Sequence, residues 1–160
     1  MDFPYPRLHF GIRFLVLTGL LASILYLMTI NDINSAWLAG FIAVCFLAIV
    51  LVSATPLFTS HCITDDGIRL RQGLLFNTLL PFGEIKSVES TETKLWAFGL
   101  FPAGDMGRIV FANSNRNLVS IKLKARRRFP MLLLRSGKEI IIDLNNPSEF
   151  VKAANDKLQR

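Results

Sequence analysis

A basic stretch flanked by apolar residues offers the first candidate chemistry in this sequence. Its members, taken here as a candidate lipid- or partner-facing site, are Lys124, Arg126, Arg127, Arg128, Phe129 and Met131. Clustered basic side chains attract polyanions such as nucleic acid, anionic lipid or acidic protein. Three interpretations stay open: a loop that binds anionic lipid with its apolar residues in the head-group layer, a solvated turn with Phe129 packed inside, and a contact for a protein partner.

The other residues with chemical potential predict neither a catalytic site nor a metal site. His61 stands beside Cys62, but neither has a second ligand or a base at a standard spacing. Asp65 and Asp66 form a turn with Gly67 and offer too few oxygens for calcium. The sequence also contains no glycine-rich phosphate loop, paired acid/base motif or triad. We therefore expect no enzymatic activity, no cofactor and no metal.

The composition separates the chain into an apolar part and a basic part. Of its 160 residues, 51% are hydrophobic, although the formal net charge is +6. The charged residues before position 59 cancel one another, and they are Asp2, Arg7, Arg13 and Asp32. The whole net charge therefore lies beyond them. We expect a membrane-embedded part over residues 1–58 and an aqueous domain over residues 59–160.

Two uncharged apolar runs, residues 14–30 and 36–54, predict a transmembrane hairpin. A helix needs ~20 apolar residues to cross the hydrocarbon core. Because Arg13 can extend its charge toward the interface, we expect the spans at about 11–30 and 36–55. A cleaved signal peptide is the alternative for the first run. However, no typical cleavage site follows it, and a second span comes directly after.

Basic residues flank this hairpin but are missing from its connecting loop. Arg7 and Arg13 precede the first run, the loop carries only Asp32, and basic residues resume at Arg69 and Arg71. The positive-inside rule therefore predicts that both termini are cytoplasmic. Small residues four positions apart in both runs allow close helix approach, which leaves a membrane-protein partner or a homo-oligomer open.

After Pro56 the pattern changes to that of β-strands. Ile68 and Leu70 alternate with Arg69 and Arg71, after a turn in which Gly67 can adopt a positive φ. A packed loop is expected over residues 94–107. One hairpin is expected to join residues 108–112 to 118–125, and another is expected to turn at Ser136–Gly137. The expected strands are a short run within residues 60–64, then 68–72, 74–80, 84–91, 108–112, 118–125, 131–135 and 138–144.

The chain is predicted to end in a helix. Asn146 is the natural N-cap, Pro147 the first helical residue, and Glu149 can reach back to the cap. The apolar stripe of this helix would close one end of the sheet, and it consists of Phe150, Val151, Ala154 and Leu158.

Several segments carry a family resemblance. Residues 63–89, "ITDDGIRLRQGLLFNTLLPFGEIKSVE", contain a Thr-Asp-x-Gly turn, a strand, a glycine, a strand and a polar-Ile-x-x-Val step. Residues 99–111 and 137–158 match the later loop and a strand-Pro-helix ending. Over roughly residues 57–158 the chain resembles bacterial pleckstrin-homology (PH) domains of the type anchored by two transmembrane helices. The resemblance implies an all-β PH-like barrel of about seven or eight antiparallel strands, capped by the C-terminal α-helix.

The resemblance also implies a function. It predicts a non-catalytic binding or scaffolding module at the cytoplasmic face of a bacterial inner membrane. Phosphoinositide-binding members have a lysine before the first turn, whereas Asp65 and Asp66 occupy the turn here and disfavour a phosphorylated head group. One alternative is a reader of anionic lipid surfaces that uses Arg126–Arg128. Another is a nucleic-acid-binding domain, for which the sequence lacks interleaved aromatics and a recognition helix.

Overall fold

A computed structural model describes residues 1–31, 35–74, 76–93, 95, 99–103, 107–112, 114–129 and 135–159. The chain divides into two compact units. The helical unit comprises Arg7–Thr59 and Gln72–Leu75. The β unit comprises the remaining segments, Met1–Pro6, Ser60–Arg71 and Phe76–Arg160.

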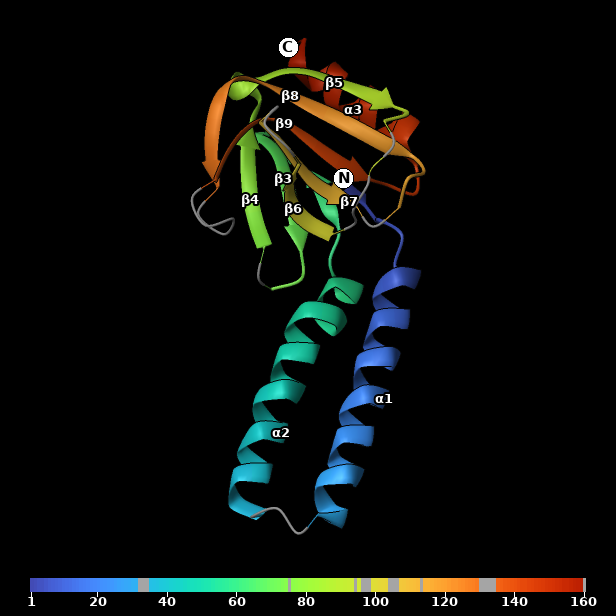
Figure 1. The fold of residues 1–160 in the computed structure, drawn as a ribbon. Coiled ribbons are helices and arrows are strands. Elements are labelled where there is room, and N and C mark those ends of the chain that lie inside the picture. The colour runs from blue at the N-terminus through green and yellow to red at the C-terminus, as the bar shows by residue number, and fades with distance from the viewer. Residues whose placement is uncertain are drawn as a thin grey trace. The chain divides into compact units, whose positions relative to one another are not determined.

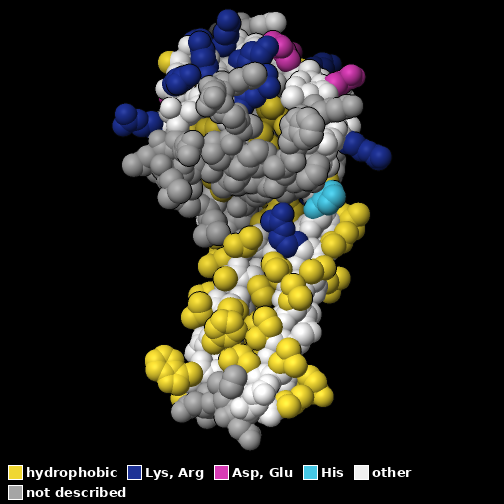
Figure 2. Space-filling view, viewed as in Figure 1, with side chains coloured by type: hydrophobic (Ala, Val, Ile, Leu, Met, Phe, Trp, Pro, Cys, Tyr) yellow, Lys and Arg dark blue, Asp and Glu magenta, His cyan; other side chains and the backbone are white. Residues whose placement is uncertain are grey.

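Two apolar helices form the helical unit (Figure 1). Helix α1 spans Leu8–Ile30, and α2 spans Ser35–Ile49 before continuing as a π-helical turn, Val50–Ala54, and a 3₁₀ turn, Thr55–Phe58. The segments Leu8–Ile30 and Ala36–Phe58 are each 23 residues long and apolar enough to cross a membrane. Hydrophobic side chains cover their surface (Figure 2). The prediction of two apolar helices is confirmed, while most of the predicted loop falls outside the described residues.

The second helix loses its α geometry before Pro56, which has no N–H for a helical hydrogen bond. The Thr55 hydroxyl donates to the Leu51 carbonyl at 2.7 Å and accepts the amide of Leu74 at 3.1 Å. Gly73 lies close by with a φ of 67°, a left-handed conformation that glycine adopts without strain. The end of the helix therefore holds the short segment around Gly73.

The first sheet of the β unit includes a strand that the sequence did not reveal. Its strands lie in the order β1 (Asp2–Phe3), β2 (His61–Ile63), β3 (Gly67–Gln72) and β4 (Phe76–Pro81). Phe3 pairs with His61, and the amino group of Met1 donates to the Ile63 carbonyl at 3.1 Å. Residues that we expected to precede a membrane span thus contribute to the β unit, and both apolar helices lie between its first two strands in the sequence.

The second sheet has the order β5-β8-β9-β7-β6. Strand β9 pairs antiparallel with β8 and parallel with β7, so the predicted hairpin between β7 and β8 is wrong. Ile140, Ile141 and Ile142 are all completely buried. A strand buried on both faces belongs in the interior of a sheet, which explains why β9 separates the other two. The strands are β5 (Ile85–Thr91), β6 (Gly99–Ala103), β7 (Arg108–Ala112), β8 (Leu118–Phe129) and β9 (Arg135–Asp143).

Two segments predicted as connections form strands instead. Strand β6 occupies part of the expected loop over residues 94–107. Ser136 and Gly137 lie within β9 and pair with Arg128 and Arg127, so they do not form the predicted turn. A Cβ atom at Gly137 would meet the Ile109 side chain at 2.6 Å. Close packing against β7 therefore accounts for this glycine.

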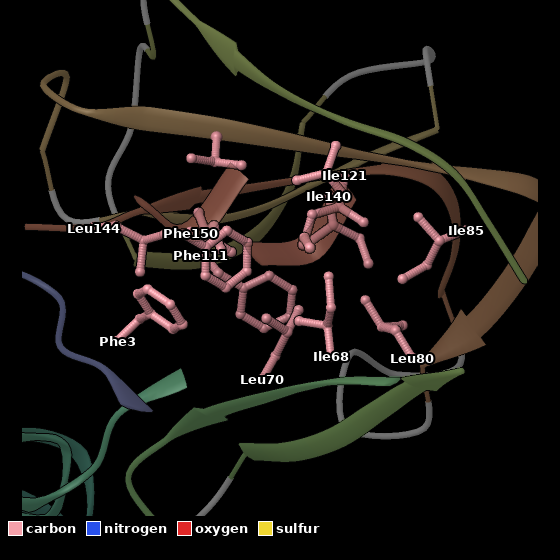
Figure 3. Packing of buried hydrophobic residues seen from close by; sticks show 14 of the residues in the cluster. Phe3, Ile68, Leu70, Leu80, Ile85, Phe111, Ile121, Ile140, Leu144 and Phe150 are labelled. Carbon is pink, nitrogen blue, oxygen red and sulfur yellow. The ribbon is translucent and has the colours of Figure 1, made fainter. Parts of the chain in front are cut away.

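The two sheets are open, so the predicted closed barrel of antiparallel strands is wrong. Within the described ranges, no ladder joins β1 or β4 to an edge of the second sheet. The larger of two apolar clusters takes its residues from both sheets and the last helix and joins them, with Leu70, Ile121 and Phe150 among its buried members (Figure 3). Side-chain packing, rather than a continuous hydrogen-bonded ladder, joins the sheets.

The predicted C-terminal helix is confirmed as α3 (Pro147–Leu158). Its N-cap position is Asn146, as expected, although the Asn146 side chain makes no capping hydrogen bond. Phe150 and Ala154 are completely buried. The Asn155 side chain donates to the Val88 carbonyl at 3.3 Å, which fixes the helix against β5.

Gly67 is needed for a reason other than the one predicted. It lies at the start of β3, and it is not among the residues with positive φ. A Cβ atom built on Gly67 would lie 2.2 Å from the Leu80 carbonyl oxygen. The close approach of β3 and β4 therefore requires glycine at this position.

Candidate functional site

The arginines predicted to occupy a loop lie in strand β8. Arg127 and Arg128 pair with Gly137 and Ser136 of β9, which corrects the loop prediction. The pairing register shifts between Lys122 and Arg127, so β8 contains an irregularity such as a bulge in the stretch that includes Arg126. Bulges re-aim side chains and bend a strand locally. The three consecutive arginines can therefore belong to a strand although none of their charged groups is buried in the core.

Four basic side chains are exposed on this strand. We call the set Lys122, Lys124, Arg126 and Arg128 the basic surface of β8; all four are exposed. The third arginine differs, since Arg127 is half-buried and forms an ion pair with Glu84 at 2.6 Å. The charge of Arg127 is thus partly neutralised by Glu84, whereas Arg126 and Arg128 remain exposed to solvent.

The apolar part of the candidate site does not join this surface. Phe129 is 1% exposed and belongs to the main core cluster. Insertion of Phe129 into a head-group layer is therefore incompatible with this fold, and the interpretation in which Phe129 packs inside holds for that residue. Met131 lies outside the described residues. The candidate site therefore consists of exposed lysines and arginines, and Phe129 does not add an exposed apolar side chain to it.

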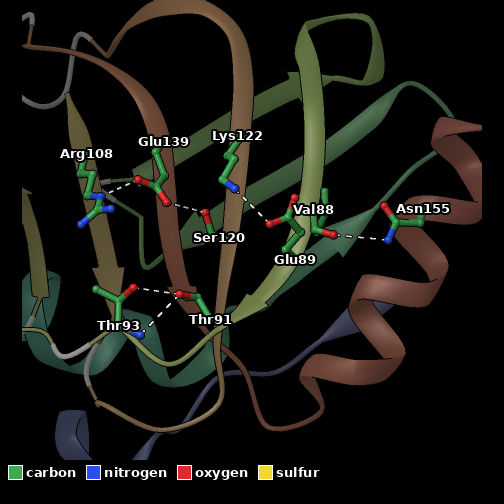
Figure 4. A network of polar contacts seen from close by, with 9 residues as sticks. All are labelled: Val88, Glu89, Thr91, Thr93, Arg108, Ser120, Lys122, Glu139 and Asn155. Atoms are coloured by element: carbon green, nitrogen blue, oxygen red, sulfur yellow. Dashed lines mark hydrogen bonds and ion pairs between the residues drawn. The ribbon is translucent and has the colours of Figure 1, made fainter. Parts of the chain in front are cut away.

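A polar network occupies the sheet beside the basic surface of β8 (Figure 4). Glu139 accepts hydrogen bonds from the Ser120 hydroxyl at 2.7 Å and from the Arg108 guanidinium. Glu89 accepts a hydrogen bond from the Lys122 ammonium at 3.0 Å. Sequence reasoning missed Arg108, Ser120 and Glu139 as a group because only the parallel pairing of β7 with β9 brings them together.

Both carboxylates of this network are held in their charged form. Burial alone would raise the pKa of Glu139, but the hydrogen bonds from Ser120 and Arg108 outweigh burial and lower that pKa. The hydrogen bond from Lys122 lowers the pKa of Glu89. Each carboxylate is therefore committed to a partner within the sheet, and neither resembles a catalytic acid.

The residues that suggested metal or nucleophile chemistry have structural roles. His61 is 1% exposed, its Nδ1 accepts the amide of Arg71 at 3.1 Å, and its ring lies 5.1 Å from that of Tyr5. Cys62 is half-buried and forms no disulfide. Across the part of the chain that the structure describes, no three His, Cys, Asp or Glu side chains gather to hold a metal. In the acidic turn, Asp65 forms an ion pair with Lys157 of α3 at 2.7 Å.

We predict that His61 makes the protein less stable in acid. Burial lowers its pKa from 6.5 to about 3, so below pH 6.5 the unfolded chain binds a proton that the folded chain does not. This part of the stability is complete above pH 6.5 and falls progressively between pH 6.5 and 3. The loss should reach about 2 kcal/mol at pH 5. Denaturant unfolding of the full chain in detergent at pH 7.5 and 5 measures it.

His61→Gln keeps a polar side chain and should remove this pH-dependent part, even if it lowers stability overall. His9→Gln is the matched control and should retain the pH dependence of the wild type. An identical loss of stability between pH 7.5 and 5 in wild type and His61→Gln would contradict the assignment.

No protein-family model, curated protein or solved structure matches the chain.

Proposed function

We propose that the chain is a membrane-anchored, PH-like binding or scaffolding module at the cytoplasmic face of a bacterial inner membrane, and that the basic surface of β8 binds anionic lipid. The exposed cations of this surface are the observation that carries the proposal. Within the described ranges Lys124, Arg126 and Arg128 form no ion pair, while Lys122 contacts Glu89. Each basic side chain near an anionic leaflet contributes about 1 kcal/mol.

The apolar helices supply the anchor in this proposal. Their exposed surface is apolar along the length of both segments, as at Leu15, Trp37 and Val44. A large exposed apolar surface marks a membrane or protein contact. A β unit tethered in this way stays close to lipid head groups, so weak contacts from a few cations suffice to hold it there.

The PH-like part of the proposal is supported by the order of elements, in which strands in two sheets precede a helix that packs on the core. The parallel pair of β7 and β9 and the open sheets depart from the expected barrel. Binding at the surface of β8 does not depend on barrel closure.

The N-terminal strand supports a shared side for both ends of the chain. Met1–Pro6 and Ser60–Arg71 belong to one β unit, although both apolar helices lie between them in the sequence. Two segments of one folded unit must lie on the same side of a bilayer. The positive-inside rule then favours the cytoplasm, because the basic residues flank the hairpin and are absent from its loop.

We predict that a reporter fused after Arg160 will be cytoplasmic. Alkaline phosphatase at this position should be inactive, because it folds only after export, whereas a fluorescent protein should be bright. A matched fusion within the loop after Asn31 should give the opposite pair of results. High phosphatase activity from the C-terminal fusion would contradict the orientation.

Lipid binding is tested with the full chain in nanodiscs of neutral lipid, which capture added vesicles. We expect capture of vesicles rich in phosphatidylglycerol, little capture of phosphatidylcholine vesicles, and weaker capture at high salt. The double variant Arg126→Gln/Arg128→Gln should lose about 2 kcal/mol, or roughly a factor of 30.

Arg69→Gln/Arg71→Gln is the matched control, because both arginines are exposed and the charge removed is the same. It should capture anionic vesicles nearly as well as the wild type. Equal capture by the wild type and the Arg126/Arg128 variant would reject the lipid-binding role of β8.

A further inference from the structure

A concave site with three lysines shares Lys122 with the basic surface of β8. The pocket has a volume of about 220 Å³ and is lined by Lys86 of β5, Lys122 and Leu123 of β8, and Lys138 and Glu139 of β9. Three adjacent strands therefore each contribute one lysine to the lining of the same pocket, and the ammonium group of Lys122 is paired with Glu89. Because these residues lie far apart in the sequence, only the strand order β5-β8-β9 brings them together.

The pocket carries more positive charge than its own carboxylates balance. Glu139 is engaged by Ser120 and Arg108. Glu89 forms an ion pair with Lys122, but Lys86 and Lys138 have no ion pair among the residues that the structure describes. In the ladders Lys122 lies opposite Ser87 of β5 and Glu139 of β9, so only an added anion would balance the charges of Lys86 and Lys138. The arrangement is therefore suited to hold an anion.

We propose that Lys86, Lys122 and Lys138 bind one phosphate group, in the form of a phosphomonoester. Lysine binds phosphate as a point charge, and the charges of three lysines that line one pocket match a dianion better than a singly charged phosphodiester. The volume lies below the ~300–1,000 Å³ of sites for drug-sized ligands, which suits a single small head group. This site is separate from Arg126 and Arg128 and does not require the lipid-binding role proposed above.

The phosphomonoester can belong to a soluble metabolite or to a lipid such as phosphatidic acid, and two assays distinguish these sources. The first titrates the full chain in phosphatidylcholine nanodiscs with glycerol 3-phosphate, followed by calorimetry. The second measures capture of vesicles that contain phosphatidic acid against vesicles with phosphatidylglycerol at matched surface charge. Binding should strengthen from pH 5.5 to 7.5, because the phosphate takes its second charge with a pKa near 6.

The test variants are Lys86→Gln and Lys138→Gln, because both side chains are exposed and neither forms an ion pair that the fold needs. Each should weaken binding about tenfold, and the double variant by roughly a factor of 100. Lys152→Gln removes the same charge from an exposed position on α3 and should bind like the wild type. Lys138→Arg should retain most of the affinity.

Loss of glycerol 3-phosphate binding in the double variant supports a soluble ligand. If the double variant loses only the preference for phosphatidic acid over phosphatidylglycerol vesicles, the result supports a lipid ligand. The Arg126→Gln/Arg128→Gln variant should keep whichever of the two is observed, the binding of glycerol 3-phosphate or the preference for phosphatidic acid over phosphatidylglycerol. This result would separate the lysine pocket from Arg126 and Arg128. If neither ligand binds in a way that depends on Lys86 and Lys138, the proposal is overturned.

Discussion

Replacing Phe150 by aspartate should unfold the β unit. Phe150 is completely buried, and its ring contacts that of Phe3 edge-on at a centroid distance of 5.0 Å. Truncating a buried phenylalanine costs ~3–5 kcal/mol, and an unpaired buried charge adds several more. The sum approaches or exceeds the ~5–15 kcal/mol by which a typical domain is stable.

Limited proteolysis of membranes that contain the full chain measures this effect. The Phe150→Asp variant should be digested beyond the second apolar helix, while the apolar helices remain with the membrane. Lys152→Asp on the exposed side of α3 is the control and should resist the protease as the wild type does. A Phe150→Asp chain with wild-type protease resistance would contradict the placement of α3 on the core. Leu158→Asp should have a smaller effect than Phe150→Asp, because Leu158 is only half-buried.

Phe3→Ala should destabilise the β unit by about 3–5 kcal/mol, although the residue precedes the first apolar helix. Its side chain is 4% exposed and packs in the same core cluster as Leu70 and Phe150. The substitution leaves a cavity at the edge of the first sheet and weakens the pairing of β1 with β2. Hydrogen exchange of the full chain in detergent should show faster exchange in β2 and β3.

Asp2→Asn is the control for this experiment, since Asp2 lies in the same strand with an exposed side chain. It should leave exchange in β2 and β3 unchanged. Unchanged protection in Phe3→Ala would mean that residues 1–6 do not stabilise the β unit, and the argument that both ends of the chain share one side would lose its support.

The sequence predicted the elements that have long or strongly periodic patterns. The two apolar helices, the alternation at Ile68 and Leu70, and the apolar stripe of α3 could all be read from local spacing. Strand β1 was missed because it is two residues long and Pro4 follows it directly. The sequence offered one sign of this strand: the aromatic residues Phe3 and Tyr5, both buried, are two positions apart, as on one face of a β-strand.

The strand order could not be read from local patterns. Residues Ile140–Ile142 were predicted to lie in the second strand of a hairpin. Sequence alone does not reveal that their strand, β9, pairs with β8 along one edge and with β7 along the other. The same limit applies to the lysine pocket, since only the order of three strands makes Lys86, Lys122 and Lys138 line one pocket. The arginine cluster was visible in the sequence, whereas its division into exposed Arg126 and Arg128 and paired Arg127 depended on the position of Glu84.

Contact between the surface of β8 and anionic lipid of the same membrane is the central claim, and fluorescence quenching tests it most directly. A fluorophore is attached to Ala125→Cys, an exposed position among the cations of β8, with Cys45 and Cys62 replaced by alanine. The labelled chain is placed in nanodiscs that contain lipids with a quencher on the head group. We expect strong quenching with phosphatidylglycerol that declines at high salt, and weak quenching with phosphatidylcholine or after Arg126→Gln/Arg128→Gln. Equal quenching in anionic and neutral nanodiscs, unchanged by salt and by the arginine substitutions, would contradict the account.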